Sequence, residues 1–87
     1  MALNFPNASR SYDATRRAVR FWGHDSSMEF TFFLTEAALK QVKPNIEPGQ
    51  DAALRVFDDN RQLIHNAAAK AYGRGRKGSY ELASSDF

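Results

Sequence analysis

Cysteine is absent from this 87-residue sequence, which excludes a disulfide framework, a thiolate zinc site and a cysteine redox pair. Long hydrophobic runs are absent as well, because the longest, such as residues 32–34, fall far below the roughly 20 residues that span a bilayer. No apolar run follows a basic start at the N-terminus, so a signal peptide is not expected. We therefore expect a cytoplasmic protein.

A large excess of one sign of charge is absent too. The 12 basic and 10 acidic side chains leave a net charge of +2, with mildly positive ends and a mildly negative middle. This balance permits weak attraction to a polyanion but lacks the basic stripe of a dedicated nucleic-acid-binding domain. A hydrophobic content of 43% nevertheless indicates a folded chain. We expect a single domain over 1–87, with an irregular lead-in over 1–11 and a tail over 84–87.

The clearest pattern that is present predicts a β-hairpin. From about Arg16 the apolar side chains of Val19 and Phe21 point to one face, and residues 23–27 have the composition of a turn. Residues 28–35 then alternate with a period of two, which is typical of a half-buried strand. The segment before Arg16, with Tyr12 and Asp13, either forms a short extra strand or leads into the first one.

Two helices follow the hairpin. Thr35 suits a helix N-cap, and the short helix after it must end near Lys43 because Pro44 disfavours helical geometry before it. After a linker, apolar residues at spacings of three and four predict a long helix from about Gln50 to Tyr72.

Residues 79–83 have the pattern of a last strand. The predicted fold is α+β with two layers and the order β-β-α-α-β. Its three-stranded antiparallel sheet has one short and one long helix packed on one face. The sequence leaves open whether the last strand lies beside 16–22 or beside 28–35.

Several of these patterns resemble a family of small bacterial proteins, the domain-of-unknown-function family 1488. The resemblance covers roughly residues 9–85 and implies the same sheet-and-helix architecture and a bacterial cytoplasmic setting. It supplies no catalytic residues. The matching patterns are Tyr12-Asp13, Ala18-Val19-x-Phe21, the return strand followed by a helix with Leu39, and Phe57-x-x-x-Arg61-x-x-Ile64-x-x-x-Ala68.

The string from Gly73 to Gly78 matches the dinucleotide-binding pattern G-x-G-x-x-G. That pattern works where a strand feeds the glycine turn and a helix leaves it. Here the predicted helix comes first and the strand second, so the string would lie at a helix C-terminus, whose partial negative charge repels phosphate. We therefore expect no bound cofactor at this string.

His24, Asp25 and Ser26 are the residue types of a nucleophilic triad, but neighbours in a tight turn do not converge as nucleophile, base and orienter. The other histidine, His65, lies about two helical turns from Asp58, unlike the close pairs that bind metals. We expect no catalytic residue, no metal site and no enzyme activity.

Arg61 falls between Phe57 and Ile64 on the apolar stripe of the predicted long helix. A guanidinium group there either reaches the edge of the core or meets a carboxylate. We expect a structural ion pair between Arg61 and Asp13, rather than a ligand contact, which would fix how the N-terminal segment docks.

The face of the hairpin opposite the core is expected to expose Arg20, Trp22, Thr31 and Phe33. Exposed aromatic rings need a cover, and three covers are open. They are the terminal segments with Phe5 and Phe87, a second copy of the chain, and stacked nucleobases. Self-association or a terminal cover is favoured, because aromatic patches on small domains usually mark interfaces.

No motif identifies a specific activity. The favoured function is a small non-catalytic interaction or accessory module that binds itself, as a homodimer, or another protein. The alternative is a weak RNA- or DNA-binding domain in which the basic loop 73–78 reinforces the sheet face. Both use one candidate interaction surface, made of Arg16, Arg17, Arg20, Trp22, Phe33, Arg74, Arg76 and Lys77.

Overall fold

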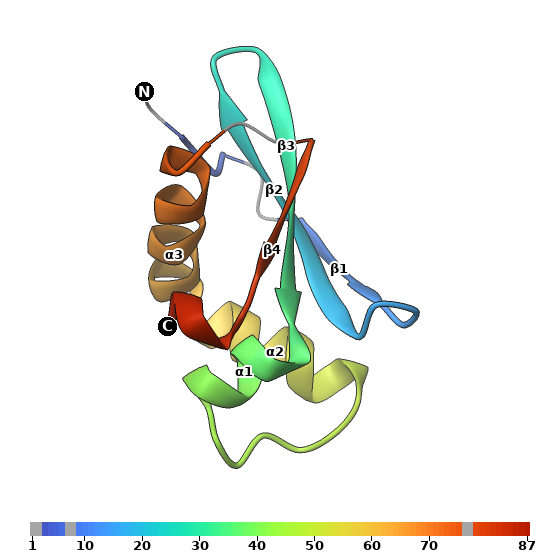
Figure 1. Cartoon of the computed structure of the whole chain (residues 1–87). Coiled ribbons are helices and arrows are strands. Elements are labelled where there is room, and N and C mark those ends of the chain that lie inside the picture. Colours follow the sequence, from blue (N-terminus) through green and yellow to red (C-terminus); the bar gives the residue numbers. More distant parts are fainter. Residues whose placement is uncertain (1–2, 7–8, 76–77) are drawn as a thin grey trace.

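A computed structural model describes residues 3–6, 9–75 and 78–87, and it confirms the α+β class (Figure 1). The strands form one sheet in the order β1-β2-β3-β4. The elements in chain order are β1 (Arg10–Asp13), β2 (Ala18–Asp25), β3 (Met28–Thr35), α1 (Glu36–Val42), α2 (Gln50–Asp59), α3 (Arg61–Gly73), β4 (Ser79–Leu82) and the 3₁₀-helix η1 (Ser84–Asp86).

The hairpin of β2 and β3 confirms the strongest sequence pattern, with paired residues running from Ala18 opposite Thr35 to Asp25 opposite Met28. Its turn is shorter than residues 23–27, because both strands extend to the two serines at 26–27. Gly23 lies inside β2. An added Cβ there would come within 2.9 Å of the Phe5 ring, so the glycine permits close packing of the N-terminal segment.

The sheet has four strands and is mixed, so the predicted three-stranded antiparallel sheet is wrong. Tyr12 and Asp13 belong to a true strand, β1, which pairs antiparallel with β2. β4 lies beside β3 and runs parallel to it. In Figure 1, α1 lies at one end of the sheet and α3 carries the chain back to the other end. The chain therefore enters β4 at the end where β3 begins, and the two strands run in the same direction.

The helical region also differs from the prediction, because 50–72 forms two helices instead of one. The break is at Asn60, whose backbone has φ −128° and ψ 28°. The Asn60 side-chain amide donates to the Val56 carbonyl oxygen at 2.9 Å, so the side chain competes with the backbone for a helical acceptor. The two aspartates before Asn60 are poor helix formers and favour the same ending.

One hydrophobic core joins the sheet and the helices. Val19, Phe21, Phe30 and Phe32 are buried on the inner face, as predicted, together with side chains of α1, α2, α3 and β4. The predicted N-cap Thr35 is confirmed, because its hydroxyl oxygen accepts from the Ala38 N–H at 3.2 Å.

Candidate interaction surface

The candidate surface is the outer face of the sheet, opposite α2 and α3. In Figure 1, α3 lies to the left of the strands, and α1 and α2 lie at their lower end. Strand register places Arg20 opposite Phe33, with Ser11 and Glu81 continuing the same row across the sheet. The next row pairs Trp22 with Thr31. The alternation seen in the sequence therefore gives the correct face for Arg20, Trp22 and Phe33.

Phe33 is not exposed as expected, because Arg16 lies over it. The Arg16 guanidinium carbon is 4.3 Å from the centre of the Phe33 ring, and only 7% of Phe33 is exposed. Two carboxylates hold Arg16 there, since its guanidinium lies 3.8 Å from Asp13 and 4.0 Å from Glu81. Phe33 therefore has no open ring face for a base to stack on.

The aromatic terminal residues lie elsewhere. Phe5 packs on the inner face, with its ring centre 6.0 Å from those of Phe21 and Phe32, and Phe87 packs against the same core. A terminal cover of the outer face is therefore not formed by either phenylalanine. The half-buried Trp22 has the guanidinium of Arg20 5.6 Å from its ring centre.

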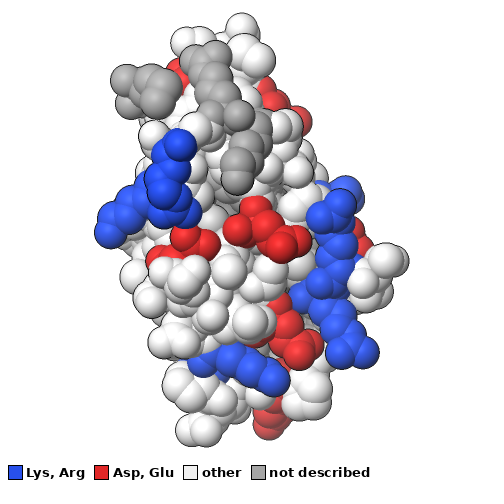
Figure 2. All heavy atoms as spheres, viewed as in Figure 1, with Lys and Arg blue, Asp and Glu red and all other residues white. Residues whose placement is uncertain are grey.

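Basic side chains gather at one end of this face. Figure 2 shows them on the right of the view, near the turn between β1 and β2, with acidic side chains beside them. Arg16 and Arg20 belong to the outer face, whereas Arg17 lines a hollow with Tyr12, an inner-face residue. At the hairpin tip, Glu29 lies 3.3 Å from His24.

The edge of the sheet at β4 brings distant parts of the candidate surface together. A hollow of about 350 Å³ there is lined by Arg16, Phe33, Arg74 and Glu81, among others. Arg74 donates to the Asp86 carboxylate at 2.8 Å, so its charge is already paired. The predicted residues at 76–77 lie outside the described part of the chain.

Asp86 ties the C-terminal segment to α3. Burial alone would raise the pKa of Asp86. The hydrogen bond from the Ala83 N–H and the interaction with Arg74 outweigh this effect, so the pKa of Asp86 lies below its ordinary value. Residues 84–86, expected as part of a tail, form η1 around this contact.

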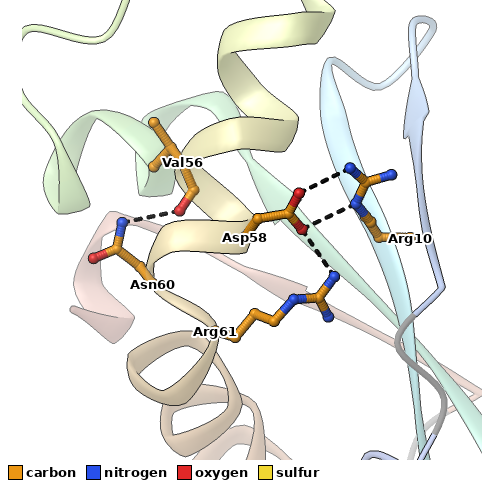
Figure 3. Close-up of polar contacts among 5 residues, drawn as sticks. All are labelled: Arg10, Val56, Asp58, Asn60 and Arg61. Carbon is orange, nitrogen blue, oxygen red and sulfur yellow. Dashed lines mark hydrogen bonds and ion pairs between the residues drawn. The ribbon is translucent and has the colours of Figure 1, made fainter.

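The predicted ion pair between Asp13 and Arg61 is wrong. Asp13 accepts the Arg16 N–H at 3.1 Å, whereas Arg61 donates to Asp58 at 2.8 Å (Figure 3). Arg10 of β1 makes a two-pronged contact with the same Asp58 carboxylate, at 3.0 Å and 2.8 Å. An ion pair does dock the N-terminal segment, but its members are Arg10 and Asp58.

The hydrogen bond from Arg10 is the main cause that holds the pKa of Asp58 below its ordinary value, and Arg61 adds to it. The same contact raises the pKa of Arg10. Arg61 also stacks on Phe57, with its guanidinium carbon 4.8 Å from the ring centre. The sequence analysis did not identify Arg10 as the residue that pairs with Asp58. Arg10 and Tyr12 lie on the same face of β1, but this is evident only once β1 is recognised as a strand.

The residues of the suspected triad point to different partners. Asp25 accepts a hydrogen bond of 2.5 Å from the Tyr72 hydroxyl, and His24 lies beside Glu29. His65 stacks on Phe5, with ring centres 4.0 Å apart and planes within 4°. Burial, helped by the Arg61 charge, lowers the pKa of His65. Over residues 3–6, 9–75 and 78–87 no group of three metal-binding side chains gathers, and no helix is long and apolar enough to span a membrane.

Fold and surface together define a class of small α+β proteins, in which helices cover one face of a mixed four-stranded sheet and arginines and aromatic rings lie on the other. The chain belongs to the family of proteins of unknown function DUF1488, whose family model matches residues 3–82. This match confirms the resemblance seen in the sequence.

The crystal structure of a Shewanella loihica protein of unknown function, from the DUF1488 family, has the same fold. Its TM-score is 0.80 at 17% sequence identity, and the match covers 92% of this chain and 90% of that chain. No curated protein matches the sequence. At this identity the likeness to the crystal structure shows the fold alone.

Proposed function

We propose that the protein is a small non-catalytic interaction module that forms a homodimer through the outer face of its sheet. The observation that carries this proposal is that Trp22, the one tryptophan of the sequence, lies on the helix-free face beside an arginine. Tryptophan and arginine are the residues most enriched at the energetic centres of protein interfaces. A bacterial cytoplasmic setting belongs to the same proposal and is compatible with a chain without cysteine.

The charges of the face complement those of a second copy. Among the described residues Arg20 has no carboxylate partner and lies over the Trp22 ring, whereas the one ion-pair partner of Glu29 is a histidine. Arg20 lies two positions before Trp22, and Glu29 lies two positions before Thr31, which is paired with Trp22. A two-fold axis close to Trp22 and crossing the strands would therefore bring Arg20 of each copy to Glu29 of the other.

This arrangement agrees with ordinary sheet packing. Two sheets that pack face to face keep their strand directions within about 30° of each other. The eight-residue strands β2 and β3 are about 26 Å long at roughly 3.3 Å per residue, which provides a long contact surface. The closed ring face of Phe33 favours a protein partner over stacked bases, because a base would first have to displace Arg16.

Sedimentation velocity at several protein concentrations tests the proposal. The wild-type chain should sediment as a dimer at high concentration, and Trp22→Ser should shift the equilibrium to monomer by at least tenfold in Kd. Leu63→Ser is the matched control, because Leu63 is 49% exposed and belongs to α3, which lies on the opposite side of the sheet from the outer face. A wild-type monomer at every concentration, or equal effects of the two substitutions, would reject the proposal.

A second candidate, weak RNA or DNA binding, is favoured by one observation. Arg16, in the turn between β1 and β2, and Arg74, in the basic loop after α3, line the same hollow at the β4 edge. Fluorescence anisotropy with single-stranded RNA and DNA at 50 mM and 200 mM salt tests it. Phosphate contacts predict an affinity that falls steeply with salt and weakens in Arg74→Ala. Binding that is absent, or that does not depend on Arg74, argues against this candidate.

A further inference from the structure

A second hollow, of about 200 Å³, lies between the β1–β2 turn, α1 and the segment that leads into α2. Its apolar wall contains Leu39 and Ala53, which are buried, and the half-buried Ile46. The volume is well below the roughly 300–1,000 Å³ of sites for drug-sized ligands, so only a small molecule fits. This hollow shares no outer-face residue with the proposed dimer surface.

Three polar side chains that border this hollow have no polar partner among the described residues. Tyr12, Arg17 and Glu47 line it, and within the described residues none of their side chains makes a hydrogen bond or an ion pair. The remaining charged residues on its wall, Glu36 and Lys40, lie 3.8 Å from each other. A concave apolar wall with a few converging polar groups is the usual form of a small-molecule site.

The backbone of Arg17 adds an independent observation. Its φ is 51°, in the left-handed region that glycine adopts freely and that other residues adopt at a cost. Residues held in this region occur in turns and cluster at ligand-binding and active sites. Ser26, in the other hairpin turn, has a similar φ of 58° but does not line this hollow, so it provides an internal control.

We propose that the hollow binds a small zwitterion, of the class of free α-amino acids with an apolar side chain. Its wall carries two basic and two acidic side chains, which suits a ligand with one charge of each sign better than a polyanion or a simple cation. Arg17 binds the carboxylate, assisted by the Tyr12 hydroxyl, and Glu47 binds the ammonium group. The ligand side chain packs on the apolar wall.

Backbone amide NMR titration of the full chain tests this proposal, with L-leucine and L-methionine as probes. Two analogues of leucine each lack one charge: 4-methylpentanoate has no ammonium group, and 3-methylbutylamine has no carboxylate. We expect saturable shifts at the residues of the hollow with both amino acids, and at least tenfold weaker binding of both analogues.

Three variants separate binding from folding. Arg17→Gly should weaken binding of leucine at least tenfold while the protein stays folded, because glycine relieves the backbone of this turn. Glu47 is exposed, so Glu47→Gln should keep the fold and weaken leucine binding to a similar extent. Ser26→Gly should leave leucine binding unchanged. The proposal is overturned by the absence of saturable shifts, by an analogue that binds as tightly as leucine, or by wild-type affinity in Arg17→Gly or Glu47→Gln.

Discussion

Asp58 is the point where two arginines from different elements meet. Arg10 comes from the edge strand β1 and Arg61 from the first turn of α3, so the three side chains join the sheet to the break between the helices (Figure 3). About a third of each side chain stays exposed to solvent, and solvent screening limits what each pair contributes to the free energy of unfolding. The value of the cluster lies in its position, because it fixes an edge strand of four residues.

Removing the Asp58 charge should destabilise the fold in a pH-dependent way. Asp58→Asn loses both ion pairs, and we expect a loss of about 0.5–1.5 kcal/mol in the free energy of unfolding at pH 7, measured by urea denaturation. Because the folded pKa of Asp58 is lowered, its contribution is complete above the unfolded value of about 3.9 and disappears as the pH falls through the folded pKa. Wild type and Asp58→Asn should therefore converge in stability as the pH falls below the folded pKa of Asp58.

Asp59→Asn is the control for this comparison. Asp59 follows Asp58 in α2 and is exposed, and it has no ion pair with any described residue. Its substitution should change the free energy of unfolding by less than about 0.5 kcal/mol. A loss as large as that of Asp58→Asn, or a difference between wild type and Asp58→Asn that persists at low pH, would contradict the role given to the cluster.

The identity of this ion pair was not predictable from the helix pattern alone. The position of Arg61 on the apolar stripe correctly indicates that its guanidinium needs a carboxylate, but the sequence offers several. Asp13 stands next to Tyr12 at the entry to the predicted sheet, which makes it the expected partner. In a strand, neighbouring side chains point to opposite faces, so Asp13 belongs to the outer face once β1 is recognised.

At the scale of elements, the sequence predicts features that depend on neighbouring residues. It does not predict features that depend on contacts between distant segments. The alternation in β2 and β3 and the cap of α1 are local, and both are confirmed. The direction of β4 depends on where α3 ends, which no short pattern contains. The break at Asn60 depends on one side chain that binds Val56, although the apolar spacing continues across it.

Gly23 illustrates the same limit and carries a second prediction. The sequence places Gly23 in the hairpin turn. In the structure Gly23 lies within β2, where its lack of a side chain allows the N-terminal segment to pack against the strand. A Cβ at this position would approach Phe5 to 2.9 Å, Leu3 to 3.0 Å and Phe32 to 3.1 Å. We therefore expect Gly23→Ala to lower the free energy of unfolding by about 1–3 kcal/mol, measured by urea denaturation.

Gly73→Ala is the matched substitution with the opposite sign. Gly73 is the last residue of α3, and apart from its chain neighbours and its own helix backbone no described residue lies within 4 Å of the added Cβ. Alanine favours the helix and restricts the unfolded chain, so stability should stay unchanged or rise by up to about 1 kcal/mol. Equal destabilisation by both substitutions would contradict close packing as the function of Gly23.

At the scale of the whole molecule, the sheet separates two kinds of surface. The inner face holds the core, and the outer face holds arginines on aromatic rings. Alternation in the sequence assigned Arg20, Trp22 and Phe33 to one face, but the covering of Phe33 by Arg16 requires the turn to fold back over the sheet. Arg17 lies only one residue from Arg16, yet it lines a different hollow, because the left-handed turn changes the direction of the chain.

Charge reversal gives the sharpest test of the proposed homodimer. If Arg20 of one copy meets Glu29 of the other, Arg20→Glu and Glu29→Arg should each place like charges opposite each other twice in the dimer. Each substitution alone should then raise the dimer Kd by at least tenfold at low salt. The double variant restores opposite charges at both contacts and should recover most of the wild-type Kd, measured by sedimentation velocity.

Recovery in the double variant is specific to a contact between copies. Within one chain Arg20 and Glu29 lie four residue positions apart along the hairpin, with Trp22 and Thr31 midway between them, so they do not pair with each other. Two independent losses of stability would add and not cancel. A double variant that dimerises as weakly as the worse single one would therefore exclude the two-fold arrangement, and any dimer that remained would have to use another face.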